Sequence, residues 1–262
     1  MLGCFNNYNF YAPKNISFKA SISDKEIDEL KYTKQYFSDC YLMSTLEALS
    51  HTKNGRRILK DNFKYDDYKP NIINCYLYNK NGVRNIYSVP IDFVVDEYKK
   101  VYDNQPNKII RTANIAVNEF EKEYKSKPTI CQIGDNFKNY EFEYNLPSNF
   151  MKMLTGIEPR VIAETDLNVD LTKYKSKVLE LFAQMDKEKD FSFVISTGMK
   201  ALDCHRWHVY VIENVDLKNN TITVKEKRSN KPQTMTIDEA LKTFKFIAGY
   251  FNSDLENIGK TI

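Results

Sequence analysis

Residues 208–226 read HVYVIENVDLKNNTITVKE, and this segment carries the plainest structural pattern in the chain. Apolar and polar residues alternate through HVYVIENV (208–215) and TITVKE (221–226), as they do in a strand with one buried face. The residues between them, DLKNN (216–220), are polar apart from the leucine and suit a turn. The segment therefore predicts a β-hairpin, and the apolar run FSFVIST (191–197) before it predicts a buried strand.

Helices are predicted on both sides of these strands. VLELFAQM (178–185) has the apolar spacing of a helix, and LPSNFMKMLTG (146–156) reads as a short helix that its glycine ends. MTIDEALKTF (235–244) predicts a helix that closes the chain. Thr236 is its expected N-cap and Glu239 stands three residues later, which is the pattern of a capping box.

A further helix is predicted early in the chain. Ser38 and Asp39 are good N-cap residues, and Leu42 and Leu46 begin an apolar stripe behind them. The dipeptide at 54–55, Asn-Gly, predicts the end of this helix. The remaining predicted elements are a hairpin of 72–79 with 83–89 around an Asn-Gly turn, a helix at 113–127 and an irregular, sheet-prone stretch at 129–145.

Helices predominate among the first of these elements and strands among the last. This asymmetry favours an α+β fold of two lobes, with any active site in the cleft between them. The predicted organisation is an extended lead-in at 1–24, a helical lobe at 25–146 and a β-rich lobe at 147–262.

The composition of the 262-residue chain narrows the possible classes of function. Hydrophobic residues make up 42% of it, which is enough for a core. No apolar run approaches the ~18–20 residues that cross a bilayer, and the first residues lack a secretory signal, so we expect no membrane partner. The expected location is cytoplasmic, or outside the cell by a route without a classical signal peptide.

Nucleic acid is not an expected partner either. The net charge is +3, far from the basic excess of an electrostatic nucleic-acid binder. Two short basic segments, GRRILK (55–60) and KEKRSNK (225–231), are flanked by acidic residues and are predicted to form solvated surface.

Cysteines and histidines supply the reactive groups. The cysteines are odd in number and form no CxxC pair, which argues against a disulfide framework and a zinc site; they are Cys4, Cys40, Cys75, Cys131 and Cys204. Cys40 falls in the first turn of a predicted helix, where the helix dipole would lower the pKa of its thiol. Among the three histidines, His51 suits a structural role as a cation at a helix end, and His205 suits a surface loop. His208 begins a strand and could face the cleft.

Three motifs resemble the calpain-type cysteine proteases. QYFSDCYLM (35–43) resembles their nucleophile motif, in which a glutamine precedes Gly-Asp-Cys-Trp-Leu-Leu. WHVYVI (207–212) resembles their Gly-His-Ala-Tyr-Ser-Val strand, and LTG (154–156) matches a Leu/Phe-Thr-Gly motif between the two. The order and spacing of the motifs are those of the family, and the likeness spans roughly residues 30 to 250. It implies a papain-like, two-lobed cysteine protease fold.

The resemblance implies that Cys40 is the nucleophile and that His208 takes its proton, giving a thiolate–imidazolium pair. The Cys40 amide and a glutamine side chain would form the oxyanion hole. In the family this glutamine stands six residues before the cysteine. Here Lys34 occupies that position and Gln35 stands five before, so we assign Gln35 and keep Lys34 open.

The residue that orients His208 is harder to assign, because the family's Asn-Pro-Trp-Gly motif is absent from this sequence. A turn around 218–219 would set His208 opposite about Ser229, and the family's residue lies slightly short of that point. Glu226 occupies this position and its carboxylate can accept the imidazole N–H. We therefore assign Glu226 and keep Asn230 as the alternative.

The resemblance implies a calpain-like cysteine endopeptidase that acts on a protein or peptide substrate and needs no cofactor or metal. Lys31 and Tyr32 stand where calpain cores carry a calcium-binding aspartate, so no calpain-like calcium switch is expected. Two alternatives stay open. One is a papain-fold deubiquitinase or acyltransferase effector, and the other is an inactive pseudoprotease that serves as a binding module.

Overall fold

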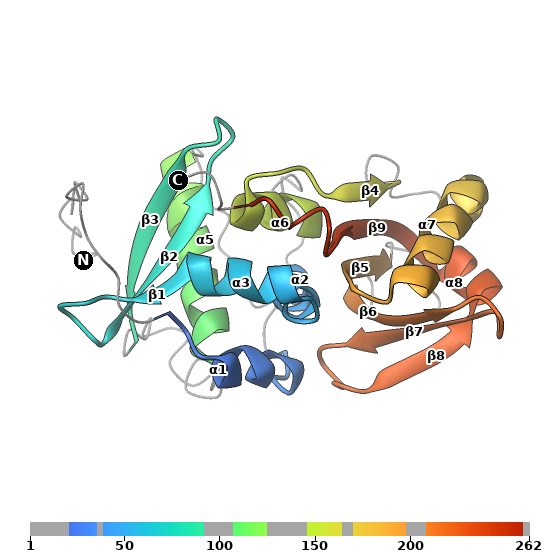
Figure 1. Ribbon diagram of the computed structural model, residues 1–262, viewed down its shortest axis with the longest axis horizontal. Coiled ribbons are helices and arrows are strands. Elements are labelled where there is room, and N and C mark those ends of the chain that lie inside the picture. Colours follow the sequence, from blue (N-terminus) through green and yellow to red (C-terminus); the bar gives the residue numbers. More distant parts are fainter. Residues whose placement is uncertain are drawn as a thin grey trace, which may run out of the picture.

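The part of the chain that the structure describes folds as a mixed α+β protein with two antiparallel sheets (Figure 1). The computed structural model describes residues 21–35, 39–91, 107–124, 146–163, 170–197 and 208–258. The predictions for 129–145, for His205 and for Cys4, Cys131 and Cys204 lie outside these residues. None of the described helices is long and apolar enough to cross a bilayer.

Helices and strands alternate unevenly along the described residues. In chain order the helical elements are α1 (Asp24–Asp28), η1 (Glu29–Lys31), α2 (Cys40–Ser50), α3 (Lys53–Asn62), α5 (Lys108–Tyr124), α6 (Pro147–Thr155), η3 (Leu171–Tyr174), α7 (Lys175–Glu188) and α8 (Ile237–Thr243). The described strands are β1 (Phe63–Tyr65), β2 (Ile72–Tyr78), β3 (Arg84–Pro90), β4 (Arg160–Ile162), β5 (Phe191–Thr197), β6 (Val209–Asp216), β7 (Thr221–Glu226), β8 (Pro232–Thr236) and β9 (Phe244–Phe251).

Several predicted elements are confirmed. The hairpin of β2 with β3 and the hairpin of β6 with β7 are both antiparallel. Gly156 ends α6 at a φ of 75°, and β5 is buried along its whole length. Thr236 and Glu239 form both hydrogen bonds of the capping box at α8.

The end of α2 was predicted wrongly. The helix begins at Cys40 as expected but ends at Ser50, and Thr52 caps a second helix, α3, that runs through the Asn-Gly dipeptide. Gly55 does not end a helix; it permits a close approach, because a Cβ there would lie 2.1 Å from the Leu49 carbonyl oxygen. Two other starts also differ, since Asp24 is already helical and α5 begins at Lys108 behind an Asn107 cap.

The six-stranded sheet has the order β4-β9-β5-β6-β7-β8. Strand β9 was not predicted: the chain continues past α8 and inserts this strand between β4 and β5. Its sequence, FKFIAGYF, does not alternate because both faces of the strand are covered. Gly249 fits here because a Cβ would meet the carbonyl oxygen of Ser192 on β5 at 2.3 Å.

Both faces of this sheet are packed. On one face Val194, Val209 and Val211 join the core built around α2 and α6, and on the other Tyr210 and Ile212 join the core beneath α7 and α8. In Figure 1, α2 lies between the small sheet of β1, β2 and β3 and the large sheet. Every residue of α2 is buried, so this helix is a central element of the core.

Candidate functional site

Cys40 stands at the first position of α2, as predicted, and is 8% exposed. The backbone N–H groups of Tyr41 and Val209 donate hydrogen bonds to the sulfur and lower the pKa of the thiol, but burial outweighs them and raises the pKa to about 11. The expected lowering at the helix N-terminus is therefore overcome by desolvation. A thiolate is not the resting form of this residue at neutral pH.

Helix α2 contacts the start of β6 through two successive turns. The N–H that reaches the Cys40 sulfur belongs to the peptide group between His208 and Val209. One turn along the helix, Ser44 Oγ donates to the carbonyl oxygen of Val209 at 3.0 Å, in a buried position. The structure therefore brings the predicted nucleophile beside the backbone of the predicted base. Ser44 was not predicted, because α2 also carries Thr45, Glu47 and Ser50 and residue type alone does not distinguish it from them.

His208 and Glu226 also come together. Nε2 of His208 lies 3.4 Å from Oε1 of Glu226, and the side chains are 3% and 8% exposed. The ring of Tyr210 packs edge-on against the imidazole, with 5.2 Å between centroids. Thr197 at the end of β5 fixes the His208 backbone, because its hydroxyl accepts the His208 N–H at 3.1 Å and its own N–H donates to the His208 carbonyl at 3.0 Å.

The register that brings them together differs from the prediction by one residue. Tyr210 pairs with Glu226, which in an extended ladder would set His208 opposite Arg228, not Ser229. The cause is a bulge between Ile212 and Asn214, where β6 carries one more residue than β7.

Asn230, the alternative partner, lies elsewhere. It adopts a φ of 54° in the turn after β7, and its backbone N–H donates to the Glu226 carbonyl at 2.8 Å. Its side-chain oxygen lies 3.5 Å from Lys227 Nζ. Its amide oxygen is thus directed at an ammonium group, whereas the side chain that contacts the His208 imidazole is that of Glu226.

Gln35 and Lys34 differ in burial. Gln35 is 7% exposed, and its backbone N–H donates to the Lys227 carbonyl at 3.0 Å, directly beside Glu226 in the chain. Lys34 is exposed. Of the two residues considered for the oxyanion position, Gln35 is the one held in the interior next to the strand that carries Glu226.

Asp39, which the sequence offered only as a helix cap, makes no side-chain cap bond. Its carboxylate is buried, accepts from Asn114 Nδ2 at 2.9 Å and has its pKa raised by desolvation to about 6. Its charge raises the pKa of Cys40, whereas the charge of Arg228 lowers it. The charges nearest the thiol therefore act in opposite directions.

His51 caps the C-terminal end of α2 but does not carry the expected charge. Burial, with Lys31, Lys225 and Lys227 nearby, lowers its pKa to about 4, although Glu47 acts the other way. The residue is therefore neutral at pH 7. Its place at the helix end fits the structural role, without the interaction between a cation and the helix dipole.

The two basic segments behave differently. At 55–60 the prediction of solvated surface holds only in part: Arg56 binds the exposed Asp24 and Asp28, but the basic side chains of the segment are half-buried and its other residues are buried. At 225–231 the prediction was wrong, because Lys225 and Lys227 are buried and bind Glu47 of α2. The alternation of TVKEKR gave no signal for this, since lysine is usually an exposed residue.

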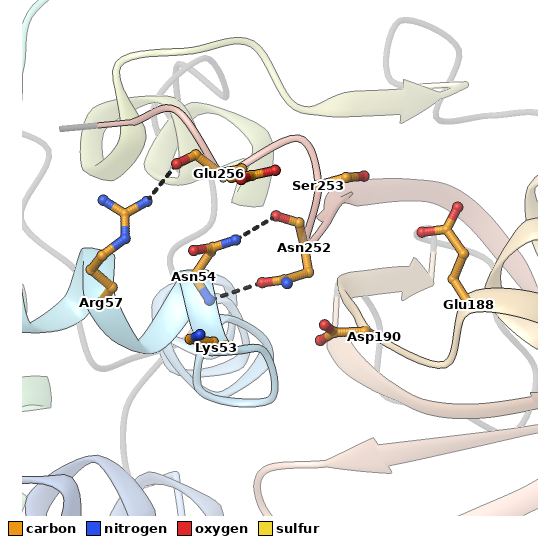
Figure 2. Close-up of a pocket in the computed structure, with 8 residues that line it drawn as sticks. All are labelled: Lys53, Asn54, Arg57, Glu188, Asp190, Asn252, Ser253 and Glu256. Carbon is orange, nitrogen blue, oxygen red and sulfur yellow. Dashed lines mark hydrogen bonds between the residues drawn. The ribbon is translucent and has the colours of Figure 1, made fainter. Parts of the chain in front are cut away.

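A polar pocket of about 670 Å³ lies apart from these groups (Figure 2). Arg57 in it donates to the Glu256 carbonyl, and Asn54 donates twice to Asn252, from its backbone N–H to Oδ1 at 2.8 Å and from Nδ2 to the carbonyl oxygen at 2.9 Å. None of the residues predicted to be catalytic lines it. Its lining is Lys53, Asn54, Arg57, Glu188, Asp190, Asn252, Ser253 and Glu256.

Within the described part of the chain, no group of three or more His, Cys, Asp or Glu residues is arranged to hold a metal ion. Comparison of the sequence with models of known protein families and with curated proteins gives no match. The chemistry proposed for the site therefore rests on the residues that form it.

Proposed function

We propose that the chain is a papain-fold, calpain-like cysteine endopeptidase with Cys40 as nucleophile and His208 as general base. The observation that carries the proposal is the convergence of three separate elements. The sulfur of Cys40 accepts the N–H of the peptide that joins His208 to Val209, and the His208 imidazole lies 3.4 Å from Glu226. A thiol, an imidazole and a carboxylate in this order are the groups that acyl transfer by a cysteine requires.

The raised pKa of Cys40 determines how the reaction would begin. Because the thiol holds its proton at rest, His208 would remove it as the sulfur attacks the peptide carbonyl, instead of forming a stable ion pair beforehand. The sulfur–carbon bond then forms, and the electron pair of the carbonyl moves onto its oxygen. Collapse expels the amine, which takes the proton from His208, and water hydrolyses the acyl-enzyme in the same manner.

The other groups assist the two proton transfers. Glu226 would stabilise the imidazolium and hold the ring in one orientation. The backbone N–H of Cys40, at the start of α2, and the side chain of Gln35 would donate to the developing oxyanion. Lys34 is the weaker choice for that position because its side chain is exposed.

The buried thiol also favours a second candidate, an inactive pseudoprotease. A cysteine whose pKa is raised to about 11 reacts slowly unless a base removes its proton. If His208 does not do this, the same fold would only bind its partner.

Labelling with an epoxide or vinyl-sulfone inhibitor of cysteine proteases separates the two candidates. An endopeptidase should be labelled at Cys40, as located by peptide mass spectrometry, and should cleave a denatured protein substrate. Cys40→Ala should abolish both, while Cys75→Ala, which alters a buried cysteine of β2, should retain both. Full proteolysis by Cys40→Ala would overturn the proposal, and absent labelling with absent cleavage would favour the pseudoprotease.

A further inference from the structure

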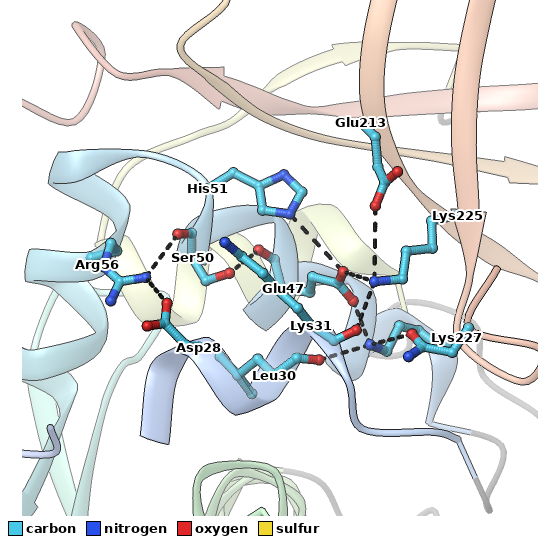
Figure 3. Close-up of polar contacts among 11 residues, drawn as sticks. Asp28, Leu30, Lys31, Glu47, Ser50, His51, Arg56, Glu213, Lys225 and Lys227 are labelled. Carbon is cyan, nitrogen blue, oxygen red and sulfur yellow. Dashed lines mark hydrogen bonds and ion pairs between the residues drawn. The ribbon is translucent and has the colours of Figure 1, made fainter. Parts of the chain in front are cut away.

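A buried ion cluster (Figure 3) includes the two residues that flank Glu226 in the sequence. The residues before and after it are both lysines, and both bind one carboxylate, that of Glu47 on α2. Lys225 Nζ lies 2.8 Å from Oε1 of Glu47, and Lys227 Nζ binds Oε2. Glu47 and Lys227 have fully buried side chains, and that of Lys225 is 8% exposed.

Besides Glu47, the two ammonium groups contact backbone carbonyl oxygens and one further carboxylate. Lys225 Nζ donates to the Lys31 carbonyl at 2.6 Å, and Lys227 Nζ donates to the Leu30 carbonyl at 2.8 Å. Glu213 on β6 lies 3.8 Å from Lys225 Nζ.

Two further titratable residues lie near this cluster. His51 lies 4.0 Å from Glu47, and Asp39 interacts with Lys227 at longer range. Burial lowers the pKa of Lys227, and Glu47 acts against that lowering. Glu47 is therefore the carboxylate that both lysines share.

The side chains of 225–227 point in alternate directions, as in an extended chain. Lys225 and Lys227 reach Glu47, and Glu226 between them reaches His208. A buried ammonium group that loses its partner is costly and moves toward another carboxylate. Lys225 has a second carboxylate, Glu213, at 3.8 Å, whereas for Lys227 the nearest carboxylate along the chain is that of its neighbour Glu226.

We propose that Glu47 is a positioning residue, which keeps Lys225 and Lys227 on the α2 side of β7 and so leaves the Glu226 carboxylate to His208. The inference rests on the proposed function, because it assigns Glu47 a task in that site. Glu47 touches none of the reacting atoms. It acts on them through Glu226, and it joins the strand end that carries Glu226 to the helix that begins with Cys40.

The test measures the pH at which the His208 imidazole loses its proton, by NMR of protein with ¹⁵N-labelled histidine. Without a carboxylate at the ring, protonation is less favourable, so the midpoint should fall by about 1 unit in Glu226→Gln. Glu47→Gln should lower it in the same direction. Tyr250→Phe is the matched control, because it removes a buried hydroxyl that bonds Thr155 and Ile157 far from this cluster, and its midpoint should stay that of the wild type.

A triple variant keeps the test decisive if Glu47→Gln folds poorly. Glu47→Leu with Lys225→Met and Lys227→Met removes both the shared carboxylate and the cations that would compete for Glu226, and apolar replacements of a buried ion cluster are often well tolerated. Its His208 midpoint should match the wild type. A wild-type midpoint in folded Glu47→Gln, or a lowered midpoint in the triple variant, would overturn the inference.

The outcome is distinguishable from failure of the proposed function. If the wild-type protein neither cleaves substrate nor labels at Cys40, the protease assignment fails, yet the titration still decides whether Glu47 controls the contact between Glu226 and His208. If the wild type is active and Glu47→Gln changes neither the titration nor the acidic limb of kcat/KM, only the role of Glu47 fails.

Discussion

The hydroxyl of Ser44 and the carbonyl of Val209 form a buried hydrogen bond of 3.0 Å that links α2, the helix that begins with Cys40, to the strand that follows His208. Ser44→Ala would leave that carbonyl without its side-chain donor, at a cost of about 1–3 kcal/mol in the free energy of unfolding. Because the helix would also be less well fixed, kcat should fall more than KM rises. Urea denaturation and steady-state kinetics would measure the two effects. An unchanged stability would show that the bond contributes nothing.

Substitutions of Glu226 and of Asn230 should have different effects on activity. Glu226→Gln keeps the shape of the side chain but removes the charge beside the imidazole, so kcat/KM should fall by about 10²-fold or more. Asn230→Gly removes the other candidate side chain and tolerates the positive φ, so activity should stay close to that of the wild type. Equal losses in both variants would contradict the assignment of Glu226.

Asp39 influences the thiol through its charge. Asp39→Asn removes a negative charge that raises the pKa of Cys40, so the thiol should titrate below its present value of about 11. The rate of alkylation by iodoacetamide, followed against pH, should rise at a lower pH than in the wild type. A profile that does not move would mean that desolvation alone sets the reactivity of this cysteine.

The buried His51 should make the free energy of unfolding depend on pH. Its pKa is lowered from 6.5 to about 4 in the folded state, so the folded chain holds this proton less tightly than the unfolded chain does. The stability that comes from keeping His51 neutral is fully present above pH 6.5 and is lost as the pH falls toward 4, by at most about 3–4 kcal/mol at about 1.4 kcal/mol per pH unit. His51→Gln should therefore lose less stability than the wild type between these pH values, as thermal unfolding would show.

Replacing Gly55 by alanine should destabilise the fold more than replacing Gly82 by alanine. A Cβ at Gly55 would overlap the Leu49 carbonyl oxygen at 2.1 Å, so the backbone of α2 or α3 must shift, and we expect a loss of about 2 kcal/mol or more. At Gly82 a Cβ meets nothing within 4 Å, and only the φ of +72° opposes it, at about 1 kcal/mol. Thermal denaturation of the two variants should preserve this order. The reverse order would contradict the close approach at Gly55.

Local patterns predicted most of the elements but not their long-range pairing. Alternation in 208–215 and 221–226 was enough to predict the hairpin, because side-chain direction in a strand follows the sequence directly. The choice of Glu226 needed in addition the position of the orienting residue in the calpain-type family. The bulge after Ile212 depends on packing and left no signal. Strand β9 was missed because a strand covered on both faces has no period.

The burial and the charge around the candidate residues could not be predicted from the local sequence. A helix N-terminus predicts a lower thiol pKa, but burial comes from the tertiary fold and reverses the direction at Cys40. Lys225 and Lys227 looked like solvent-exposed residues because nothing local marks Glu47, on a distant helix, as their partner. Burial and ion pairs between segments far apart in the sequence are therefore the features that local patterns do not predict.

The place of β9 in the large sheet has a consequence for synthesis on the ribosome. Translation proceeds from the amino end, so β4 and β5 are synthesised before β9, the strand that pairs with both of them. A nascent chain arrested before Phe244 would present two open edges, and it should be digested by a protease that spares chains extended beyond Phe251.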